Sequence, residues 1–496
     1  MHNFAPMEKY DLCVIGGGPS GYAAAMRAID FGKKVLLIEK DKIGGAGLYN
    51  GALWSKTMWE YSQKIMQIRQ ETGANHASFE GMMKMVDEAL FDRKFQMTVH
   101  MKLLHEETES KLFYYEKGKA SFIDQHQILI QKKNEDKIIY AENVVIATGS
   151  RPRKVDNIPV DEKIIVTSDG IANFNKLPES LVVVGAGVIG CEFATIFSNL
   201  GKTKVFLIDK GDRILPFEDE DVALTVMDNL EKNGVVIHKN SSLNKIEEIN
   251  GRVCYELKYN DGTLESFEVE HALISIGRVP NVEDLNLSAA GVELTPRGYV
   301  KENDTQTTTP NIYVAGDLSA NIALVNVGER EGRHAVARMY GHHVKPLVYS
   351  NISTIMFLNP EVASVGMGEQ EAMDKCISVK VAKIDYSCIA RAIAMRKTNG
   401  FFKIIVSNDD EMKLLGMRAV GEHASSAIQA VAYLIHTNQG IEELAVMMHP
   451  HPSIIEGIQE CVRMLLGKSI YKSSVFKDKL KCYVREQDVC VPLERL

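Results

Sequence analysis

A chain of 496 residues is too long for one hydrophobic core, so its length predicts several domains. Its 45% hydrophobic and 25% charged residues are typical of a soluble globular protein, and its formal net charge of −8 argues against a broad nucleic-acid-binding surface. It contains no apolar run long enough to cross a bilayer and no secretory signal, so we expect a cytoplasmic protein without a membrane span.

The first predicted unit reads as strand, glycine turn, alanine-rich helix and strand: YDLCVIGGGPSGYAAAMRAIDFGKKVLLIEK. Gly16, Gly18 and Gly21 form G-x-G-x-x-G directly after the apolar strand at 12–15, and Glu39 ends the second strand. In this setting the first glycine makes the turn, the second admits a pyrophosphate and the third lets helix pack on strand. The acidic residue accepts hydrogen bonds from a ribose hydroxyl. The unit therefore predicts a dinucleotide-binding site.

Strand VVIATGSRP, residues 144–152, and strand ALISIGRVPN, residues 272–281, each end in a glycine turn followed by Arg and Pro. The turn glycines are Gly149 and Gly277. We expect each of these strands to close a nucleotide-binding domain.

The same glycine-rich unit recurs as LVVVGAGVIGCEFATIFSNLGKTKVFLIDK, with Gly185, Gly187 and Gly190 in the motif and Asp209 after the second strand. Two such units predict two bound dinucleotides. The Asp209 carboxylate can bind a free 2′-hydroxyl and would repel a 2′-phosphate, which favours NAD(H) over NADP(H). Three nearby lysines, which would attract a phosphate, weaken this preference: Lys202, Lys204 and Lys210.

A further signal is TTTPNIYVAGDLS, residues 307–319, in which a short strand delivers Gly316 and Asp317 at its carboxyl end. Ligands of doubly wound sheets bind at that edge. The Asp317 carboxylate there is a candidate to bind the ribityl chain of a flavin. The alternative is a turn aspartate that caps the next helix.

Eight cysteines are scattered along the chain without a C-x-x-C pair. This pattern suits a reducing compartment and indicates neither a disulfide framework nor a zinc ribbon, so we expect no metal site. The cysteines are Cys13, Cys191, Cys254, Cys376, Cys388, Cys461, Cys482 and Cys490.

These motifs, in this order, resemble the FAD-dependent pyridine nucleotide–disulfide oxidoreductases, and among them the dihydrolipoamide dehydrogenases. The resemblance spans residues 8–470 and extends to NPEVASVGM and HPHPSIIE. It implies a glutathione reductase-like α/β fold with two Rossmann-like domains, which bind FAD and NAD, and a C-terminal α+β dimerisation domain that makes a homodimer. We expect FAD-binding parts at 1–153 and 283–348, the NAD-binding domain at 154–282, the dimerisation domain at 349–470 and a tail at 471–496.

The resemblance also implies which residues bind the cofactors. Those expected at FAD are Gly16, Gly18, Gly21, Glu39, Lys56, Gly149 and Asp317. Those expected at the nicotinamide nucleotide are Gly185, Gly187, Gly190, Asp209 and Gly277.

Lys56 and Glu192 match a pair of catalytic residues in this family. The resemblance places the lysine beside the flavin N5 and the glutamate next to the lysine. A cation there stabilises negative charge on the reduced flavin, and a buried lysine needs a carboxylate partner to remain charged. Without the family resemblance, a solvated helix lysine is the better interpretation of Lys56.

The segment IGGAGLYNGALWSK, residues 43–56, departs from the family pattern. In the family, two cysteines in C-x₄-C spacing form a redox disulfide over the flavin. Alignment on the flanking Gly-Gly and Ser-Lys places Gly47 and Ala52 at their positions, and neither side chain can form a thiolate. The usual proline is replaced by Trp54. We therefore expect the disulfide relay to be absent.

His451 and Glu456 match the family dyad in which the glutamate orients the histidine, and the histidine serves as base for a thiol of the opposite subunit. Without that thiol, one hypothesis is that His451 gives a proton to a reduced acceptor. The other is that it is an interface histidine held by Glu456.

The tail from Lys468 to Leu496 runs beyond the usual end of the family, is basic at first (KSIYKSSVFKDKLK) and carries Cys482 and Cys490. In some relatives a C-terminal cysteine pair acts as a second relay. Here no redox motif surrounds the two cysteines, so a surface or interface tail is the favoured interpretation.

The sequence thus predicts an FAD- and NAD(H)-binding oxidoreductase that reduces a small-molecule, non-disulfide acceptor such as a quinone. Three alternatives stay open. The first is a dihydrolipoyl dehydrogenase or related disulfide reductase that uses other cysteines. The second is a nicotinamide nucleotide transhydrogenase, and the third is a non-catalytic flavoprotein subunit.

Overall fold

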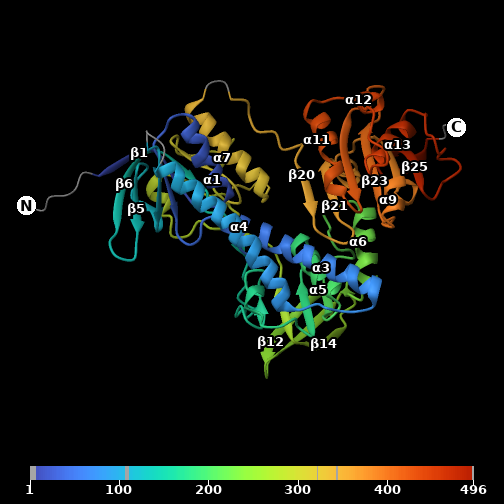
Figure 1. Cartoon of the computed structure of the whole chain (residues 1–496), viewed down its shortest axis with the longest axis horizontal. Helices are drawn as coiled ribbons and strands as arrows, with labels where there is room; N and C mark the ends of the chain where they lie inside the picture. Colours follow the sequence, from blue (N-terminus) through green and yellow to red (C-terminus); the bar gives the residue numbers. More distant parts are fainter. Residues whose placement is uncertain (1–6, 107–110, 321, 342–343, 494–496) are drawn as a thin grey trace, which may run out of the picture. The chain divides into compact units, whose positions relative to one another are not determined.

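The computed structural model describes residues 7–106, 111–320, 322–341 and 344–493 (Figure 1). The chain forms two compact units, each assembled from segments that are far apart in the sequence. The first unit comprises Met1–Lys64, His76–Leu177 and Ile276–Leu347. The second comprises Ile65–Asn75, Pro178–Ser275 and Val348–Leu496.

A parallel sheet forms the centre of the first unit, with its strands in the order β19-β6-β1-β2-β3. All neighbours among these five strands are parallel. Both faces of the sheet's centre are covered, which fits the buried apolar runs LCVI in β1, VLLI in β2 and VVI in β6. The strands are β1 (Glu8–Ile15), β2 (Val35–Glu39), β3 (Phe113–Lys117), β6 (Lys137–Ile146) and β19 (Ile312–Val314).

Helices α1 (Pro19–Asp30) and α7 (Val325–Tyr340) lie on one face of this sheet, where alanines of both helices pack on alternate strand residues. The two helices approach closely because α7 presents glycines to α1. A Cβ at Gly328 or Gly332 would overlap the Oγ or the carbonyl oxygen of Ser20, respectively. The opposite face packs on β4 (Lys119–Phe122), β5 (Gln127–Gln131) and the 3₁₀ turn η2 (Leu287–Ala290).

Several shorter elements complete the first unit. Strands β7 and β16, which follow the turn glycines Gly149 and Gly277, pair with each other in antiparallel orientation. Helix α3 begins in this unit, and its last turns, from Ile65 on, belong to the second. These elements are α2 (Gly45–Leu48), α3 (Ala52–Thr72), α4 (Phe79–Glu106), β7 (Ser150–Pro152), β8 (Ile165–Val166), η1 (Ile171–Asn173), β16 (Arg278–Pro280), β17 (Glu302–Asn303) and β18 (Gln306–Thr307).

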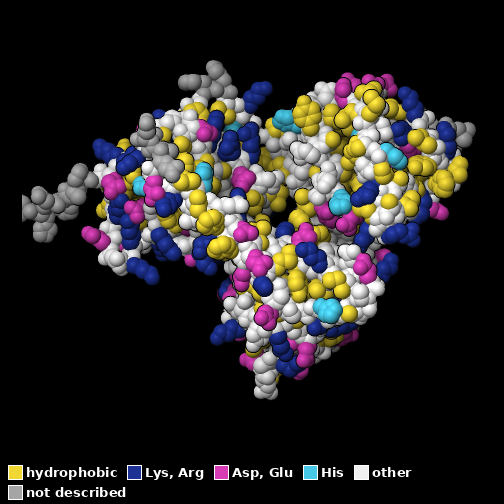
Figure 2. All heavy atoms as spheres, in the orientation of Figure 1, with side chains coloured by type: hydrophobic (Ala, Val, Ile, Leu, Met, Phe, Trp, Pro, Cys, Tyr) yellow, Lys and Arg dark blue, Asp and Glu magenta, His cyan; other side chains and the backbone are white. Residues whose placement is uncertain are grey.

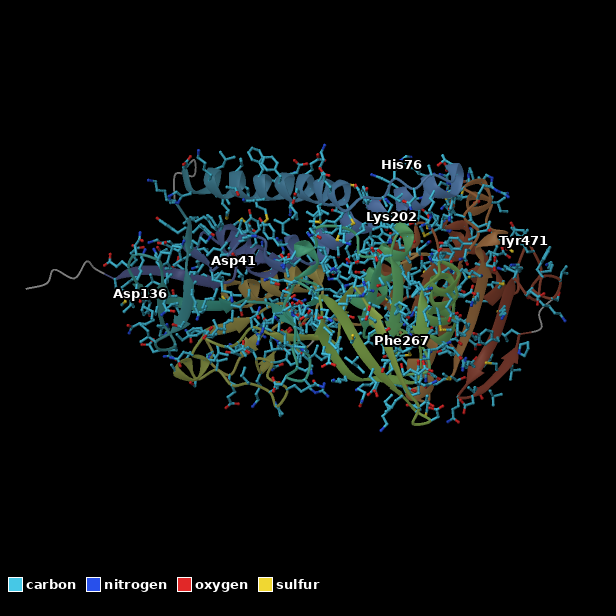
Figure 3. All side chains as sticks on the ribbon, turned by 90° about the horizontal axis from the view of Figure 1, so that it is seen from below. Asp41, His76, Asp136, Lys202, Phe267 and Tyr471 are labelled. Atoms are coloured by element: carbon cyan, nitrogen blue, oxygen red, sulfur yellow. The ribbon has the colours of Figure 1, made fainter. Side chains whose placement is uncertain are left out.

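The second unit contains another parallel sheet, with strand order β11-β10-β9-β15. Helix α5 connects β9 to β10 and ends at Gly201, whose φ of 65° is the left-handed conformation typical of a glycine cap. An antiparallel meander of β12, β13 and β14 follows, and it carries Phe267, labelled in Figure 3. The elements are β9 (Ser180–Val184), α5 (Val188–Leu200), β10 (Lys204–Ile208), α6 (Glu220–Lys232), β11 (Val236–His238), β12 (Ser241–Ile249), β13 (Arg252–Tyr259), β14 (Leu264–Val269) and β15 (His271–Ile274).

The C-terminal part of the second unit is a seven-stranded sheet in the order β20-β21-β24-β23-β22-β25-β26. Strands β25 (Leu480–Glu486) and β26 (Val489–Pro492) form a hairpin that adds two strands to one edge of this sheet. The other strands are β20 (Ser353–Met356), β21 (Val362–Gly366), β22 (Val379–Asp385), β23 (Phe401–Ser407) and β24 (Leu414–Val420).

Helices surround this C-terminal sheet and share an apolar core with it. They are α8 (Glu369–Asp374), η3 (Tyr386–Cys388), α9 (Ala390–Ala394), α10 (Ala424–Ala427), α11 (Gln429–His436), α12 (Glu442–Val446) and α13 (Glu456–Leu465). Among the described helices, none is both long enough and apolar enough to span a membrane.

A buried ionic cluster joins the start of α6 to the C-terminal sheet within the second unit. The Lys403 side chain is fully buried, and its Nζ lies 2.7 Å from Asp219, 2.7 Å from Asp221 and 2.8 Å from Glu369. These three carboxylates converge as metal ligands do, but the lysine ammonium stands between them and supplies the positive charge. The β25 hairpin contributes Arg485, which lies 3.1 Å from Glu369.

Candidate cofactor and active site

The first glycine loop connects β1 to α1 and cannot accept side chains at two of its three glycines. Gly16 has a φ of 110°, and a Cβ there would overlap the carbonyl oxygen of Ala147. A Cβ at Gly21 would overlap the carbonyl oxygen of Gly16. By contrast, a Cβ at Gly18 would meet nothing within 4 Å. The space left open at Gly18, at the N-terminus of α1, is where a phosphate can approach the backbone.

Glu39, the last residue of β2, is held beside this loop by two backbone groups. Its Oε2 accepts a hydrogen bond from the Gly17 N–H at 2.7 Å, and its Oε1 accepts one from the Asp41 N–H at 2.8 Å. A carboxylate has about four lone-pair sites, so two remain to accept ribose hydroxyls. The backbone thus fixes the carboxylate in position before any ligand binds.

Asp317 lies at the carboxyl end of β19 and is half-buried. Ser150 donates a hydrogen bond to its Oδ2, and the Arg278 Nε donates to the Ser150 Oγ at 2.8 Å. The preceding Gly316 donates its N–H to the buried Glu331 carboxylate at 2.7 Å. This network holds the carboxylate at the sheet edge, and its contact with a flavin stays a prediction.

The segment 43–56 packs against the first glycine loop. The Gly44 N–H donates to the Gly17 carbonyl at 2.8 Å, and a Cβ at Gly47 would overlap the ring of Pro19. Ala52 is the first residue of α3 and is half-buried. Lys56 lies in the first turns of the same helix, also half-buried, with its Nζ 3.3 Å from the Oγ of Ser55.

The second glycine loop repeats the geometry of the first. Gly185 has a φ of 103°, and a Cβ at Gly190 would overlap the carbonyl oxygen of Gly185. A Cβ at Gly187 would meet nothing within 4 Å. Asp209, which follows β10, accepts hydrogen bonds from the N–H groups of Ala186 at 3.0 Å and Gly211 at 2.8 Å.

Helix α5 carries Glu192 and Cys191 in the second unit, and both are buried. Glu192 accepts a hydrogen bond from the Phe357 N–H at 3.0 Å. Its predicted pairing with Lys56 stays a prediction. Burial raises the pKa of the Cys191 thiol, which disfavours the reactive thiolate and fits a packing role.

His451 and Glu456 form a hydrogen-bonded dyad in the second unit. The His451 Nδ1 lies 2.6 Å from the Glu456 Oε1, and the Ser453 N–H donates to Glu456 Oε2 at 3.1 Å. The His451 side chain is 70% exposed, against 27% for Glu456. A carboxylate accepts hydrogen bonds, so this contact favours the tautomer that carries the proton on Nδ1.

Comparison with known families shows which protein family has this arrangement of two glycine loops. The family described as pyridine nucleotide-disulphide oxidoreductase matches residues 10–332, and its dimerisation domain matches residues 352–462. The chain belongs to this family. The predicted fold class, with two nucleotide-binding domains and a dimerisation domain, is confirmed. The dimerisation domain also supports a homodimer.

Relatives from this family match almost the whole chain. A dihydrolipoyl dehydrogenase of Geobacillus stearothermophilus is 31% identical over 464 residues, which cover 93% of this chain and 97% of that protein. The dihydrolipoyl dehydrogenase of Chlamydia trachomatis is 32% identical over 455 residues, with coverages of 90% and 95%. These relatives place the chain among the FAD-dependent pyridine nucleotide oxidoreductases.

Solved structures show the same architecture. The crystal structure of LpdA from Mycobacterium tuberculosis has a TM-score of 0.84 at 27% identity, and the match covers 92% of this chain and 99% of that one. RclA, an HOCl-induced flavoprotein disulfide reductase of Escherichia coli, has a TM-score of 0.81 at 24% identity, with coverages of 92% and 100%. The RclA match, at this identity, shows a shared fold alone.

Both cofactors implied by the family fit the residues present. At Gly18 and at Gly187 there is open space where a Cβ would stand, so the backbone of each loop is accessible to a pyrophosphate. Each loop also has a carboxylate fixed at the end of the second strand. The chain therefore offers one dinucleotide cradle in each unit.

The sequence did not lead us to the residues whose hydrogen bonds hold Asp317 and its neighbour Gly316 in place. Ser150 and Arg278 directly follow the motifs at Gly149 and Gly277, so their proximity to the turns was a usable signal. Glu331 had no such signal, because a glutamate inside an amphipathic helix usually faces water. Gly149 and Gly277, with φ of 67° and 105°, form the turns that lead into β7 and β16. Their contact with a cofactor stays a prediction.

Proposed function

We propose that this protein takes hydride from NADH through FAD and delivers the electrons to a small-molecule, non-disulfide acceptor such as a quinone. The observation that carries the proposal is the pair Gly47 and Ala52, at the positions where the family resemblance expects the redox cysteines. Neither residue has a thiol. The overlap of a Cβ at Gly47 with the ring of Pro19 supports the same conclusion, because this backbone leaves little room for a side chain there.

The family resemblance and the geometry of the two loops support a role for each residue. Gly16, Gly18 and Gly21 shape the loop that binds the FAD pyrophosphate, Glu39 binds its ribose and Asp317 its ribityl chain. Bound FAD supplies the hydride and electron chemistry that amino-acid side chains lack. The family resemblance implies that Lys56 would supply a positive charge to bound, reduced FAD, with Glu192 as the carboxylate partner that it predicts.

The second glycine loop binds the nicotinamide nucleotide. Gly185, Gly187 and Gly190 admit the pyrophosphate, and Asp209 selects NAD(H) because its carboxylate repels a 2′-phosphate. Two backbone N–H groups hold that carboxylate in place. If it turned away to admit a 2′-phosphate, it would lose these two hydrogen bonds.

His451 serves as the proton donor to the electron acceptor. Glu456 holds the Nδ1 proton, which leaves Nε2 of the exposed ring to pass a proton to an acceptor that has taken up electrons. The protein acts as a homodimer. Its eight cysteines, all within the described part of the chain, are scattered and none is paired with another, a pattern that supports a cytoplasmic location, where thiols persist.

The test mixes purified holoprotein with NADH under anaerobic conditions and follows the flavin absorbance. Menadione, dihydrolipoamide with NAD, or a nicotinamide nucleotide analogue is then added as acceptor or donor. Loss of absorbance on NADH addition, followed by its return with menadione turnover, is the expected result. The matched variant Cys482→Ser should leave this turnover unchanged.

Other outcomes point to other functions. Dihydrolipoamide turnover that disappears in Cys482→Ser would assign a dithiol relay to the C-terminal cysteines. Rapid hydride exchange with the nucleotide analogue, without menadione turnover, would indicate a transhydrogenase. No loss of flavin absorbance with either NADH or NADPH would indicate a non-catalytic flavoprotein.

A further inference from the structure

The chain between α13 and β25, together with the start of β25, has a composition unlike the rest of the molecule. Residues 468–481 read KSIYKSSVFKDKLK and hold five lysines and one aspartate, whereas the whole chain has a net charge of −8. This basic–apolar segment lies beyond residue 462, where the match to the dimerisation domain ends. Over the face drawn in Figure 2, by contrast, basic and acidic side chains are interspersed.

The basic–apolar segment also displays large apolar side chains to solvent. Tyr471, labelled in Figure 3, lies at the surface of the C-terminal part of the second unit. The exposed fractions are 64% for Ile470, 41% for Tyr471, 70% for Val475 and 50% for Phe476. Apolar side chains grouped in this way, with lysines between them, mark an interaction surface more often than an isolated exposed residue does.

An ordered loop presents these side chains. The buried Glu460 carboxylate accepts hydrogen bonds from the Ser469 Oγ at 2.6 Å and the Ile470 N–H at 3.0 Å. The Val475 N–H then donates to the Lys472 carbonyl at 2.8 Å, and the Leu480 N–H donates to the Phe476 carbonyl at 2.9 Å. The loop is therefore anchored to α13 at its start and braced by hydrogen bonds of its own, while Val475 and Phe476 stay exposed.

Most of the lysine charge in this segment is not neutralised within the described residues. Lys479 lies 3.2 Å from Asp385. For the other four lysines, the described part of the chain shows no carboxylate within 4.0 Å of the ammonium. These four are Lys468, Lys472, Lys477 and Lys481, and all are exposed.

We propose that the basic–apolar segment binds the surface of an anionic lipid bilayer. Lysines near such a surface gain about 1 kcal/mol each from the negative headgroups, and clusters of four or more are typical of this attraction. The exposed side chains of Val475 and Phe476 enter the boundary between headgroups and acyl chains. The purpose of this binding rests on the proposed function, because a lipid-dissolved quinone is reached at that surface. The binding itself does not depend on it.

The test is co-sedimentation of the holoprotein with phosphatidylcholine vesicles prepared with or without phosphatidylglycerol, in the absence of any substrate. The protein should sediment with the anionic vesicles, remain in solution with the neutral ones and detach as sodium chloride is added. Lys472→Glu with Lys477→Glu should weaken the partition by more than about tenfold. Val475→Ser with Phe476→Ser should weaken it while leaving the salt dependence in place.

Matched variants test whether any loss of net positive charge or of exposed apolar side chains, wherever it occurs on the molecule, weakens vesicle binding. Lys133→Glu with Lys258→Glu changes the net charge equally on other exposed surfaces. Phe91→Ser with Phe95→Ser removes side chains that are 65% and 59% exposed on α4. Both control pairs should bind anionic vesicles as the parent protein does. FAD content and menadione turnover in solution should be the same in all four pairs, so failure of lipid binding is distinguishable from failure of the proposed function.

Three results would overturn the proposal. Equal sedimentation with neutral and anionic vesicles would remove the role of the lysines. A change from dimer to monomer in the Lys472→Glu, Lys477→Glu variant, measured by light scattering, would assign the segment to the subunit interface. Retention on polyglutamate beads without any vesicle binding would assign it to an acidic protein partner.

Discussion

The two glycine-rich loops of this protein fold alike, although they lie in different compact units. In each loop a Cβ on the third glycine would overlap the carbonyl oxygen of the first, and the second glycine faces open space. In each unit the acidic residue at the end of the second strand accepts two backbone hydrogen bonds. One comes from an N–H of the glycine loop, and the other comes from the N–H of the residue two positions after the acidic residue. This geometry depends only on strand, turn and helix, so it recurs wherever that sequence pattern does.

The surroundings of the two loops differ. Helix α1 buries one face, with Gly21, Ala24, Ala25 and Ala28 inside. Helix α5 is buried at every residue from 190 to 200. The second loop also shares its unit with the C-terminal sheet, to which the Lys403 cluster ties the start of α6. Equal local geometry of the loops thus coexists with unequal anchoring of the units that carry them.

Removal of the buried lysine should have the largest effect on stability. Lys403→Met leaves Asp219, Asp221 and Glu369 without their shared cation, which we expect to cost about 3–5 kcal/mol. The two tryptophans, Trp54 and Trp59, lie in the first unit. In urea, the circular dichroism transition should therefore move further than the tryptophan fluorescence transition.

The control for this change is Lys413→Met, which breaks an exposed, solvent-screened pair with Glu411 and should leave both transitions nearly unmoved. If Lys403→Met shifts both transitions equally, the two units unfold as one. The contrast in anchoring would then have no energetic consequence.

Overpacking the third glycine should have the next largest effect, and it should be similar in both loops. Gly21→Val and Gly190→Val each force a side chain into the carbonyl oxygen of Gly16 or Gly185, at about 1–3 kcal/mol. Gly21→Val should release FAD, measured by the ratio of flavin to protein absorbance. Gly190→Val should keep FAD and lose NADH binding, measured by titration. FAD loss from Gly190→Val would show that the loops are not independent.

Acid should weaken the second unit through the same ionic cluster. Lys403 and Lys383 outweigh burial and lower the pKa of Asp221 to about 2. A carboxylate with a depressed pKa stabilises the fold fully above its unfolded pKa of about 3.9 and loses that contribution as pH falls through about 2. The melting temperature should fall over this window. In Lys403→Met this fall in melting temperature should be smaller, because the cation that lowers the pKa of Asp221 has been removed.

The glycine loops and their acidic partners were predictable from the sequence because all their contacts lie within one strand–helix–strand unit. The relevant spacings are fixed by the backbone, so reading Gly16 to Glu39 was enough. The Lys403 cluster was not predictable, since it joins α6, α8 and β23 across long stretches of chain. A lysine between a phenylalanine and an isoleucine is typical of a strand. Its burial is explained only by the three carboxylates around it, which are distant in sequence.

The C-terminal hairpin was also missed. The sequence favoured a surface or interface tail, but residues 480–486 pair with β22 and bury Cys482 in the core. Strand pairing between distant segments depends on an open sheet edge, which no local pattern reveals. The predicted five-part division of the chain and the cofactor contacts of individual residues stay predictions.

A methyl group on the second glycine should reduce affinity with little effect on stability. A Cβ at Gly18 or Gly187 meets nothing within 4 Å, so Gly18→Ala and Gly187→Ala should fold normally. The methyl group would occupy the space of a pyrophosphate, and we expect about tenfold weaker binding of FAD or NADH, respectively. The measurements are FAD dissociation and the KM for NADH. Unchanged values would place the phosphates elsewhere.

The smallest effect distinguishes the acidic residues of the two loops. Asp209→Asn removes the negative charge but keeps the shape and one acceptor oxygen for the N–H of Ala186 or Gly211. Relief of the repulsion should raise the ratio of kcat/KM for NADPH to that for NADH by about three- to tenfold. Glu39→Gln is the matched change in the first loop, and FAD carries no 2′-phosphate. It should weaken FAD retention and leave the coenzyme ratio unchanged. If Asp209→Asn left the ratio unchanged, the three neighbouring lysines would be the better candidates for setting coenzyme preference. If Glu39→Gln altered the ratio as much as Asp209→Asn, the assignment of FAD to the first loop and of NAD(H) to the second would be wrong.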